Sequence, residues 1–207
     1  MTAASATTAS AVAVAVALVV AWWLPGLRGD GSPDRDPDIV LVGDGELIRG
    51  SDVVSRRLRE EGFSVAEPVE AADWCEVADR VADASARVAV VIHIDPVDDV
   101  PGDDCESPSQ VADRIVGTQP RVVVVSGLGP AGDDDSDEVL DALTARGATS
   151  VDVSRLLAGV DGATSCLWWD DCVVADNGNA YVVVRDESGL TLAGHQRMAR
   201  MIVSAVQ

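Results

Sequence analysis

Short, almost wholly apolar runs separated by longer amphipathic stretches are the feature that most constrains the fold of this chain. The clearest runs span residues 38–42, 87–94 and 121–126. A parallel strand covered by helices on both faces is apolar throughout, whereas a half-exposed strand alternates with polar residues. The three runs therefore predict buried parallel strands.

The stretches between these runs have the spacing of amphipathic helices. Alternating strands and helices of this length predict an α/β fold, with a doubly wound parallel five-stranded sheet in flavodoxin-like order and helices on both faces. The other predicted strands span residues 63–66 and 149–153, with a further short extended run at 181–185. The predicted helices span residues 51–61, 71–85, 108–117, 134–146 and 191–206.

Composition limits the class of protein. The chain has 207 residues, 47% of them hydrophobic, which favours one folded domain. Its net charge of −20 argues against a nucleic-acid partner, which needs a basic surface. The glycines in residues 127–132 do not form a phosphate-binding motif, so no nucleotide is expected. The chain has two histidines, and its acidic loops lack the spacing of a calcium site, so no metal and no cofactor is expected.

The N-terminus predicts a membrane segment. Residues 1–27 carry no charged side chain, and about 18 of them form an apolar stretch near the lower limit for spanning a bilayer. Trp22 and Trp23 lie where an interfacial aromatic belt is expected. A cleaved signal peptide is the alternative, but the basic start and the small-residue cleavage site typical of one are not evident. We therefore favour an uncleaved transmembrane helix, followed by a tether (28–37) and a domain (38–207).

Two signals disagree on the side of the membrane that the domain occupies. Arg28 and Arg35 follow the apolar segment, and positive charges favour the cytoplasm. Four cysteines favour disulfides and an oxidising compartment. We give the cysteines more weight and expect a single-pass protein of the cell membrane with its domain outside the cytoplasm.

Three motifs carry a resemblance to a known family. Residues 39–45 form an apolar run that ends in Gly-Asp-Gly, which resembles the first block of the SGNH (GDSL-type) hydrolases. In that block a strand ends in Gly-Asp-Ser, and the serine is the nucleophile; Gly45 stands at its position. Residues 92–95 are similar to the family's Gly-x-Asn-Asp block, with Ile94 at the position of the asparagine that donates to the oxyanion.

The last family block, Asp-x-x-His-Leu-Thr, resembles residues 186–191, where Asp186 matches the aspartate and Gly189 takes the place of the histidine. The run from Asp152 through the cysteines to Asp186 is closest to SGNH domains associated with membrane acyltransferases that modify envelope glycans. The resemblance covers residues 38–207. It implies a disulfide between Cys166 and Cys172, which leaves Cys75 and Cys105 as the second pair.

The resemblance implies that the nucleophile, the base and the asparagine donor are all substituted, which leaves open whether the chain is an enzyme. It favours a catalytically degenerate domain that binds or scaffolds in cell-envelope glycan modification, with an envelope glycan or a membrane acyltransferase as partner. The alternative is an active O-acyl esterase or acyltransferase that uses non-standard groups, for which the candidates are His93, Asp95 and Ser51. Ligands of such sheets bind beyond the carboxyl ends of the strands. The binding candidates there are Asp44, Gly45, His93, Ser126 and Asp186.

Trp168 and Trp169 lie between two of the cysteines. Aromatic rings at such a position either pack over a disulfide or, when exposed, stack on a sugar ring. We favour packing.

Overall fold

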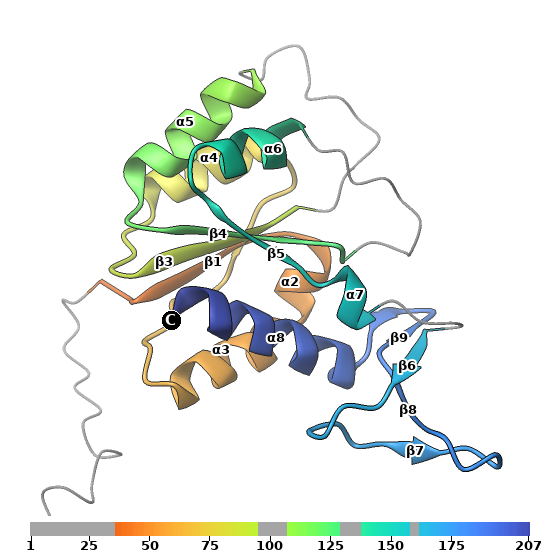
Figure 1. Ribbon diagram of the computed structural model, residues 1–207. Coiled ribbons are helices and arrows are strands. Elements are labelled where there is room, and N and C mark those ends of the chain that lie inside the picture. Colours follow the sequence, from red (N-terminus) through yellow and green to blue (C-terminus); the bar gives the residue numbers. More distant parts are fainter. Residues whose placement is uncertain (1–35, 95–106, 129–137, 158–161) are drawn as a thin grey trace, which may run out of the picture. The chain divides into compact units, whose positions relative to one another are not determined.

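A parallel five-stranded sheet forms the centre of the domain (Figure 1). The computed structural model describes residues 36–94, 107–128, 138–157 and 162–207. The strand order is β2-β1-β3-β4-β5, and every neighbouring pair is parallel. The fold is therefore of the predicted α/β class. The strands are β1 (Ile39–Gly43), β2 (Val69–Glu70), β3 (Ala89–His93), β4 (Val122–Ser126) and β5 (Thr149–Asp152).

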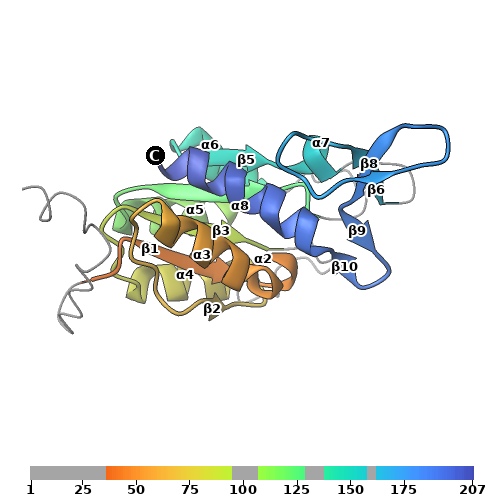
Figure 2. The same cartoon turned by 90° about the horizontal axis from the view of Figure 1, so that it is seen from below.

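Helices cover both faces of this sheet (Figures 1 and 2). One face carries α3 (Ser51–Glu60) and α8 (Leu192–Val206). The opposite face carries α4 (Trp74–Asp83), α5 (Pro108–Thr118) and α6 (Glu138–Ala145). Two short helices, α2 (Gly45–Arg49) and α7 (Ser154–Leu157), follow β1 and β5 directly.

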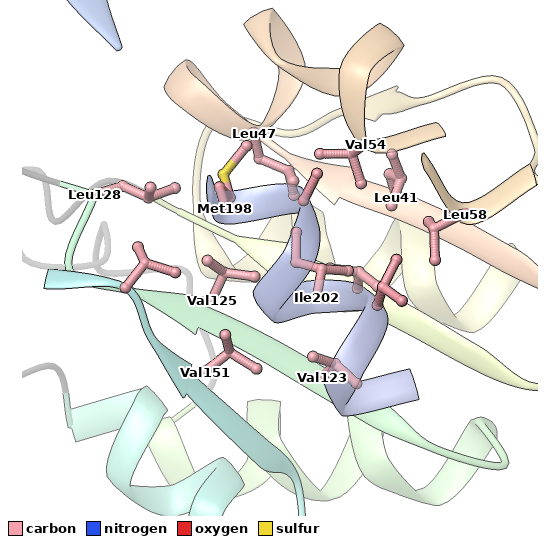
Figure 3. Close-up of a cluster of buried hydrophobic side chains, with 14 of the residues drawn as sticks. Leu41, Leu47, Val54, Leu58, Val123, Val125, Leu128, Val151, Met198 and Ile202 are labelled. Atoms are coloured by element: carbon pink, nitrogen blue, oxygen red, sulfur yellow. The ribbon is translucent and has the colours of Figure 1, made fainter. Parts of the chain in front are cut away.

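The alternation of side chains along each strand divides the interior into two apolar clusters. In β1, Ile39 and Leu41 face α3 and α8, whereas Val40 and Val42 face α4 and α5. Figure 3 shows the first cluster, where Ile202 of α8 lies among side chains of the sheet and of α3. Full burial of such a side chain stabilises the fold by about 1.5–3 kcal/mol. Both faces of the central strands are covered, which explains why β1, β3 and β4 are apolar along nearly their whole length.

The predicted strand at residues 63–66 is wrong in its position. Val65 forms a single bridge with Ile39, and the second strand of the sheet begins at Val69. Backbone pairing starts there, since the Ile39 N–H donates to the Ser64 carbonyl oxygen and the Ala66 N–H donates to that of Ile39, both at 3.0 Å. It does not continue because the next residue in position to donate is Pro68, which has no N–H, and pairing resumes at Val69. The other predicted strands and helices are found at or near the predicted residues.

A small antiparallel sheet, absent from the sequence-based prediction apart from the run at 181–185, follows the main sheet. It consists of β6 (Ala163–Ser165), β7 (Val173–Val174) and β8 (Ala180–Val183), in the order β6-β8-β7. A two-residue hairpin, β9 (Arg185–Asp186) and β10 (Gly189–Leu190), then leads into α8. Figure 2 shows these strands beyond the first turn of α8, near α2 and α7.

Arg197 of α8 connects this small sheet to the helix layer. Its guanidinium is buried and donates to the carbonyl oxygens of Leu156 (2.6 Å) and Ser165 (2.8 Å). It also forms an ion pair with the buried carboxylate of Asp170 at 2.5 Å. A buried charge is tolerated when such partners satisfy it. The loop between β6 and β7 is therefore held by one side chain that reaches it from α8.

Two observations concern the cysteines. Cys166 and Cys172 form a disulfide, with Cα atoms 6.0 Å apart, across the same loop. Cys75 is also disulfide-bonded, and its expected partner, Cys105, lies outside the described residues. The pairing implied by the resemblance is therefore present for the short loop.

Within the described ranges, the helices are too short or too polar to cross a membrane. The predicted N-terminal anchor, residues 1–27, lies outside these ranges, and so does most of the tether (28–37).

Ile202 and Leu192 give a matched test of burial on one helix. Ile202 is fully buried, whereas Leu192 at the start of α8 is 59% exposed. We expect Ile202→Ala to lower the free energy of unfolding by about 2–5 kcal/mol, because it leaves a cavity between α8 and the sheet. We expect Leu192→Ala to change it by less than about 0.5 kcal/mol. Urea unfolding of the two variants checks this, and equal effects would contradict the assigned face of α8.

Asp170 gives a test with pH. Burial raises the pKa of its carboxyl, but hydrogen bonds from Arg197 and from the Leu167 N–H outweigh this and hold the pKa below its ordinary value. A pKa that folding lowers contributes stability above the unfolded pKa, about 3.9, and this contribution is lost as pH falls through the folded pKa. We expect Asp170→Asn to cost about 3 kcal/mol at pH 7. The difference between the two proteins should shrink as pH falls below about 4, as measured by urea unfolding at each pH. A constant difference would contradict the assignment.

Candidate functional site

The chain reverses its strand order between β1 and β3, and ligands of doubly wound sheets bind beyond the carboxyl ends of the strands at such a point. Here Gly43 pairs with His93, and the Asp44 N–H donates to the His93 carbonyl oxygen at 3.2 Å. A Cβ built on Gly43 would collide with that carbonyl group. Glycine therefore lets the two strands end side by side, and it places Asp44 and Gly45 at this edge.

Gly45 begins α2 with a φ of +45°, in the left-handed region that favours glycine. Glycine is thus the residue that this backbone accepts most easily. The same residue stands at the position of the nucleophile in the resemblance, so no side chain attacks from here.

The adjacent residue, Glu46, is the centre of the site and was missed by the sequence analysis. Its carboxylate is buried and accepts three hydrogen bonds from separate parts of the chain. The donors are Arg49 Nη2 at 2.7 Å, the Leu190 N–H at 3.1 Å and His195 Nε2 at 3.2 Å. These donors offset the cost of taking a carboxylate out of water. The cluster ties α2 to β10 and to the first turn of α8.

Gly189 lies directly against this carboxylate. It has a φ of +120°, and a Cβ built on it would collide with Oε1 of Glu46. A side chain at the position of the family's histidine therefore requires the Glu46 carboxylate to move from its place. Gly45 and Gly189, distant in sequence, both adjoin Glu46 at one end of the sheet.

Asp186 does not orient a histidine in this structure. Its Oδ1 accepts hydrogen bonds from the hydroxyl (2.6 Å) and the N–H (2.8 Å) of Ser188. These bonds lower the pKa of the Asp186 carboxyl and fix the turn between β9 and β10. The carboxylate that orients an imidazole here is Glu46, and that imidazole belongs to His195.

His195, in the first turn of α8, has more contacts than a residue on a helix surface usually has. Its ring packs against Gly50, where a Cβ would collide with the ring carbons. Ser51 follows Gly50 as the first residue of α3, and its hydroxyl makes no hydrogen bond with the described residues. Among the described residues, Ser51 and His195 therefore form no hydrogen-bonded pair.

The side chains of His93, the last residue of β3, and of Ile94, the next residue, have different surroundings. The ring of His93 is buried, and its Nδ1 donates to the carbonyl oxygen of Val125 at 2.8 Å. Ile94 is also buried, in the apolar cluster beneath α4 and α5. The side chain at the family's oxyanion position therefore belongs to the core. Asp95, the proposed companion of His93, lies outside the described residues.

Ser126 is the last residue of β4, the strand beside β3. It pairs with Asp152, whose Oδ1 accepts the Ser154 N–H at 2.9 Å. A Cβ built on Gly127 would collide with Asp152 and Ser154, so the chain is closely packed where β4 and β5 end. Ser126 is half-buried and is placed, like Asp44 and His93, at the carboxyl edge of the sheet.

Chemically, the described part of the site offers a carboxylate–imidazole pair without a nucleophile in hydrogen-bond contact with it. No cluster of three or more histidine, cysteine or acidic side chains suited to a metal occurs in the described ranges. Neither the scan of protein-family models nor the search of curated proteins finds a match to this chain.

A double-mutant cycle tests the contact between Glu46 and Gly189. We expect Gly189→Ala to cost about 2–4 kcal/mol, because it combines an unfavourable φ with a collision at the Glu46 carboxylate. Glu46→Ala alone should cost about 1–3 kcal/mol, because it leaves the Leu190 N–H without an acceptor. In the Glu46→Ala background, Gly189→Ala should cost at least about 1 kcal/mol less.

The four proteins are compared by urea unfolding. Gly62→Ala is a matched control, since Gly62 also has a positive φ but has open space where a Cβ would lie. Its cost should be the same with and without Glu46. Strict additivity of Glu46→Ala and Gly189→Ala would contradict the packing described here.

Proposed function

We propose that this chain is a membrane-anchored, extracytoplasmic domain of the SGNH hydrolase type that has lost catalysis and acts by binding in cell-envelope glycan modification. The single observation that carries the loss of catalysis is the Glu46 carboxylate, which fills the space in front of Gly189. A histidine at that position and this carboxylate cannot occupy the same volume.

The arrangement of the strand ends supports the proposed fold relationship. The strand order β2-β1-β3-β4-β5 is that of a flavodoxin-like doubly wound sheet. The residues at the positions of the nucleophile and the base, Gly45 and Gly189, both adjoin Glu46, as a shared catalytic centre would require. The disulfide between Cys166 and Cys172 favours an oxidising compartment.

The proposed binding surface is the carboxyl edge of the sheet. Asp44 follows β1 and Ser126 ends β4 there, and His93, which ends β3 between them, is buried beneath this surface. Asp186 lies in the hairpin whose Gly189 contacts Glu46. The partner is an envelope glycan or a membrane acyltransferase that modifies it.

One observation favours a second candidate, an active O-acyl esterase or acyltransferase. His195 Nε2 donates to the Glu46 carboxylate at 3.2 Å, so a carboxylate orients this imidazole as one does in hydrolases, although there the carboxylate binds the other ring nitrogen, Nδ1. Ser51 is the nearest serine to this pair in the sequence, beside Gly50. In this candidate, catalysis requires Ser51 to move into contact with the His195 ring.

Hydrolysis of p-nitrophenyl acetate by the purified full-length chain separates the two candidates. We expect no turnover above the spontaneous rate, and no change on His195→Ala or Ser51→Ala. Turnover that Ser51→Ala or His195→Ala abolishes, in a variant that remains folded, would support the second candidate and overturn the first.

The change Gly45→Ser with Gly189→His tests the relationship to the hydrolases. We expect little or no gain of activity, because the new histidine collides with Glu46. The missing asparagine donor alone costs about 10²–10³-fold in comparable sites. Adding Glu46→Ala makes room, and a gain confined to this triple variant would support the relationship.

Binding to the carboxyl edge of the sheet is tested separately by sedimentation of the protein with insoluble cell-wall glycan. We expect Ser126→Arg to weaken this binding and the exposed control Ser204→Arg to leave it unchanged.

A further inference from the structure

The large apolar side chains that the described residues leave exposed all come from one segment near the C-terminus. Trp168 is 89% exposed and Val174 is 68% exposed. A group of apolar side chains on the surface of a strongly charged protein commonly marks an interaction site. The group belongs mainly to the small sheet and consists of Trp168, Val173, Val174, Val183 and Leu192.

Strand β7 is an edge of that sheet, and its backbone is arranged to accept another strand. The Ala175 N–H donates to Asn179, which fixes the pair 175/179 as hydrogen-bonded. Pairs alternate along an antiparallel ladder, so Val174, opposite Ala180, belongs to a non-hydrogen-bonded pair. Its N–H and C=O therefore point away from β8, toward the open edge.

The side chains beside this edge form an apolar face. Val173 lies opposite Tyr181 in the register of β7 and β8. Val183 follows Tyr181 by two residues and lies on the same face of β8. Val173 and Val183 are 50% and 39% exposed. An added strand would thus find main-chain partners at Val174 and apolar contacts on the face beside it.

The acidic residues around β7 determine which kind of added strand can pair with it. Asp171 and Asp176 flank β7 on both sides, and Asp186 and Glu187 are also exposed nearby in the sequence. The one basic residue of segment 162–192, Arg185, donates to the carbonyl oxygen of Leu128. Acidic residues that flank an apolar edge strand oppose its pairing with a second copy of the same chain. The same carboxylates favour a strand that carries cationic flanks.

We propose that β7 is a docking edge for an extended apolar segment of a partner protein that carries arginine or lysine on both flanks. The segment adds to the small sheet as a further strand, with main-chain hydrogen bonds to Val174 and ion pairs to Asp171 and Asp176. This surface is separate from the strand ends around Glu46, and the inference does not depend on the function proposed for them.

The probe is a labelled synthetic peptide of alternating threonine and valine with two arginines at each end. Binding to the full-length chain is measured by fluorescence anisotropy. We expect binding at least about tenfold tighter than that of the same peptide with glutamates at its ends, because like charges oppose association. A peptide with methylated backbone nitrogens should not bind, because it lacks the N–H groups that an added strand donates.

Val174→Pro is the decisive variant. The Val174 N–H does not bond to β8, so proline at this edge position leaves the small sheet intact while it removes the docking donor. We expect it to weaken binding of the arginine peptide about tenfold or more, and Asp171→Asn with Asp176→Asn to weaken it as well. Val69→Thr, in the two-residue edge strand β2 of the main sheet, is the control and should have no effect.

Three outcomes would overturn the proposal. One is no binding of the arginine peptide at millimolar concentration. A second is equal binding by the Val174→Pro protein with an unchanged circular dichroism spectrum, which would show general attraction to an acidic protein. The third is equal binding of the methylated peptide, which would exclude strand addition.

Discussion

The charge of one buried carboxylate sets the arrangement of the site. Glu46 lies in a five-residue helix, where few contacts within the helix can hold it, yet its carboxylate is removed from water. It is stable there because donors reach it from Arg49, from the backbone of β10 and from α8. Arg49 belongs to α2 itself, but the other two donors, Leu190 and His195, belong to β10 and α8, so the position of α2 is fixed by residues nearly 150 positions away. The close approach of Gly50 to His195, and of Gly189 to Glu46, follows from the same requirement.

The ion pair between Arg197 of α8 and Asp170 has a similar role, because it fixes the small sheet against α8. Arg197 and Asp170 are both buried, and the arginine also binds two carbonyl oxygens. The small sheet contributes few buried apolar side chains, with Val182 as its main one. It is therefore held by this polar contact and by the Cys166–Cys172 disulfide more than by a core of its own. A helix that covers the main sheet thus also positions the surface on which the exposed apolar group lies.

The sequence predicted secondary structure well where a strand is buried on both faces, because such a strand is a short run of apolar residues. β1, β3 and β4 were predicted because they are apolar up to their last residues, Gly43, His93 and Ser126. It was uninformative where a contact is made between distant residues. Nothing near Glu46 indicates that its carboxylate is buried, because the donors at Leu190 and His195 become neighbours only in the fold. The strands of the small sheet are two to four residues long and largely exposed, so they carry no periodic signal. The second strand was misplaced because pairing around Val65 is interrupted at Pro68, which has no N–H to donate, and resumes at Val69.

The positive φ and crowded surroundings of Gly189 have a consequence for descent. For a chain derived from an active hydrolase, restoring the histidine at this position is not a single step back. The histidine collides with Glu46, and removing Glu46 first leaves the Leu190 N–H and the His195 ring without their acceptor. Either order passes through a less stable intermediate. On the proposed descent from such a hydrolase, the packing of Glu46 against Gly189 would therefore oppose the return of the histidine by single substitutions.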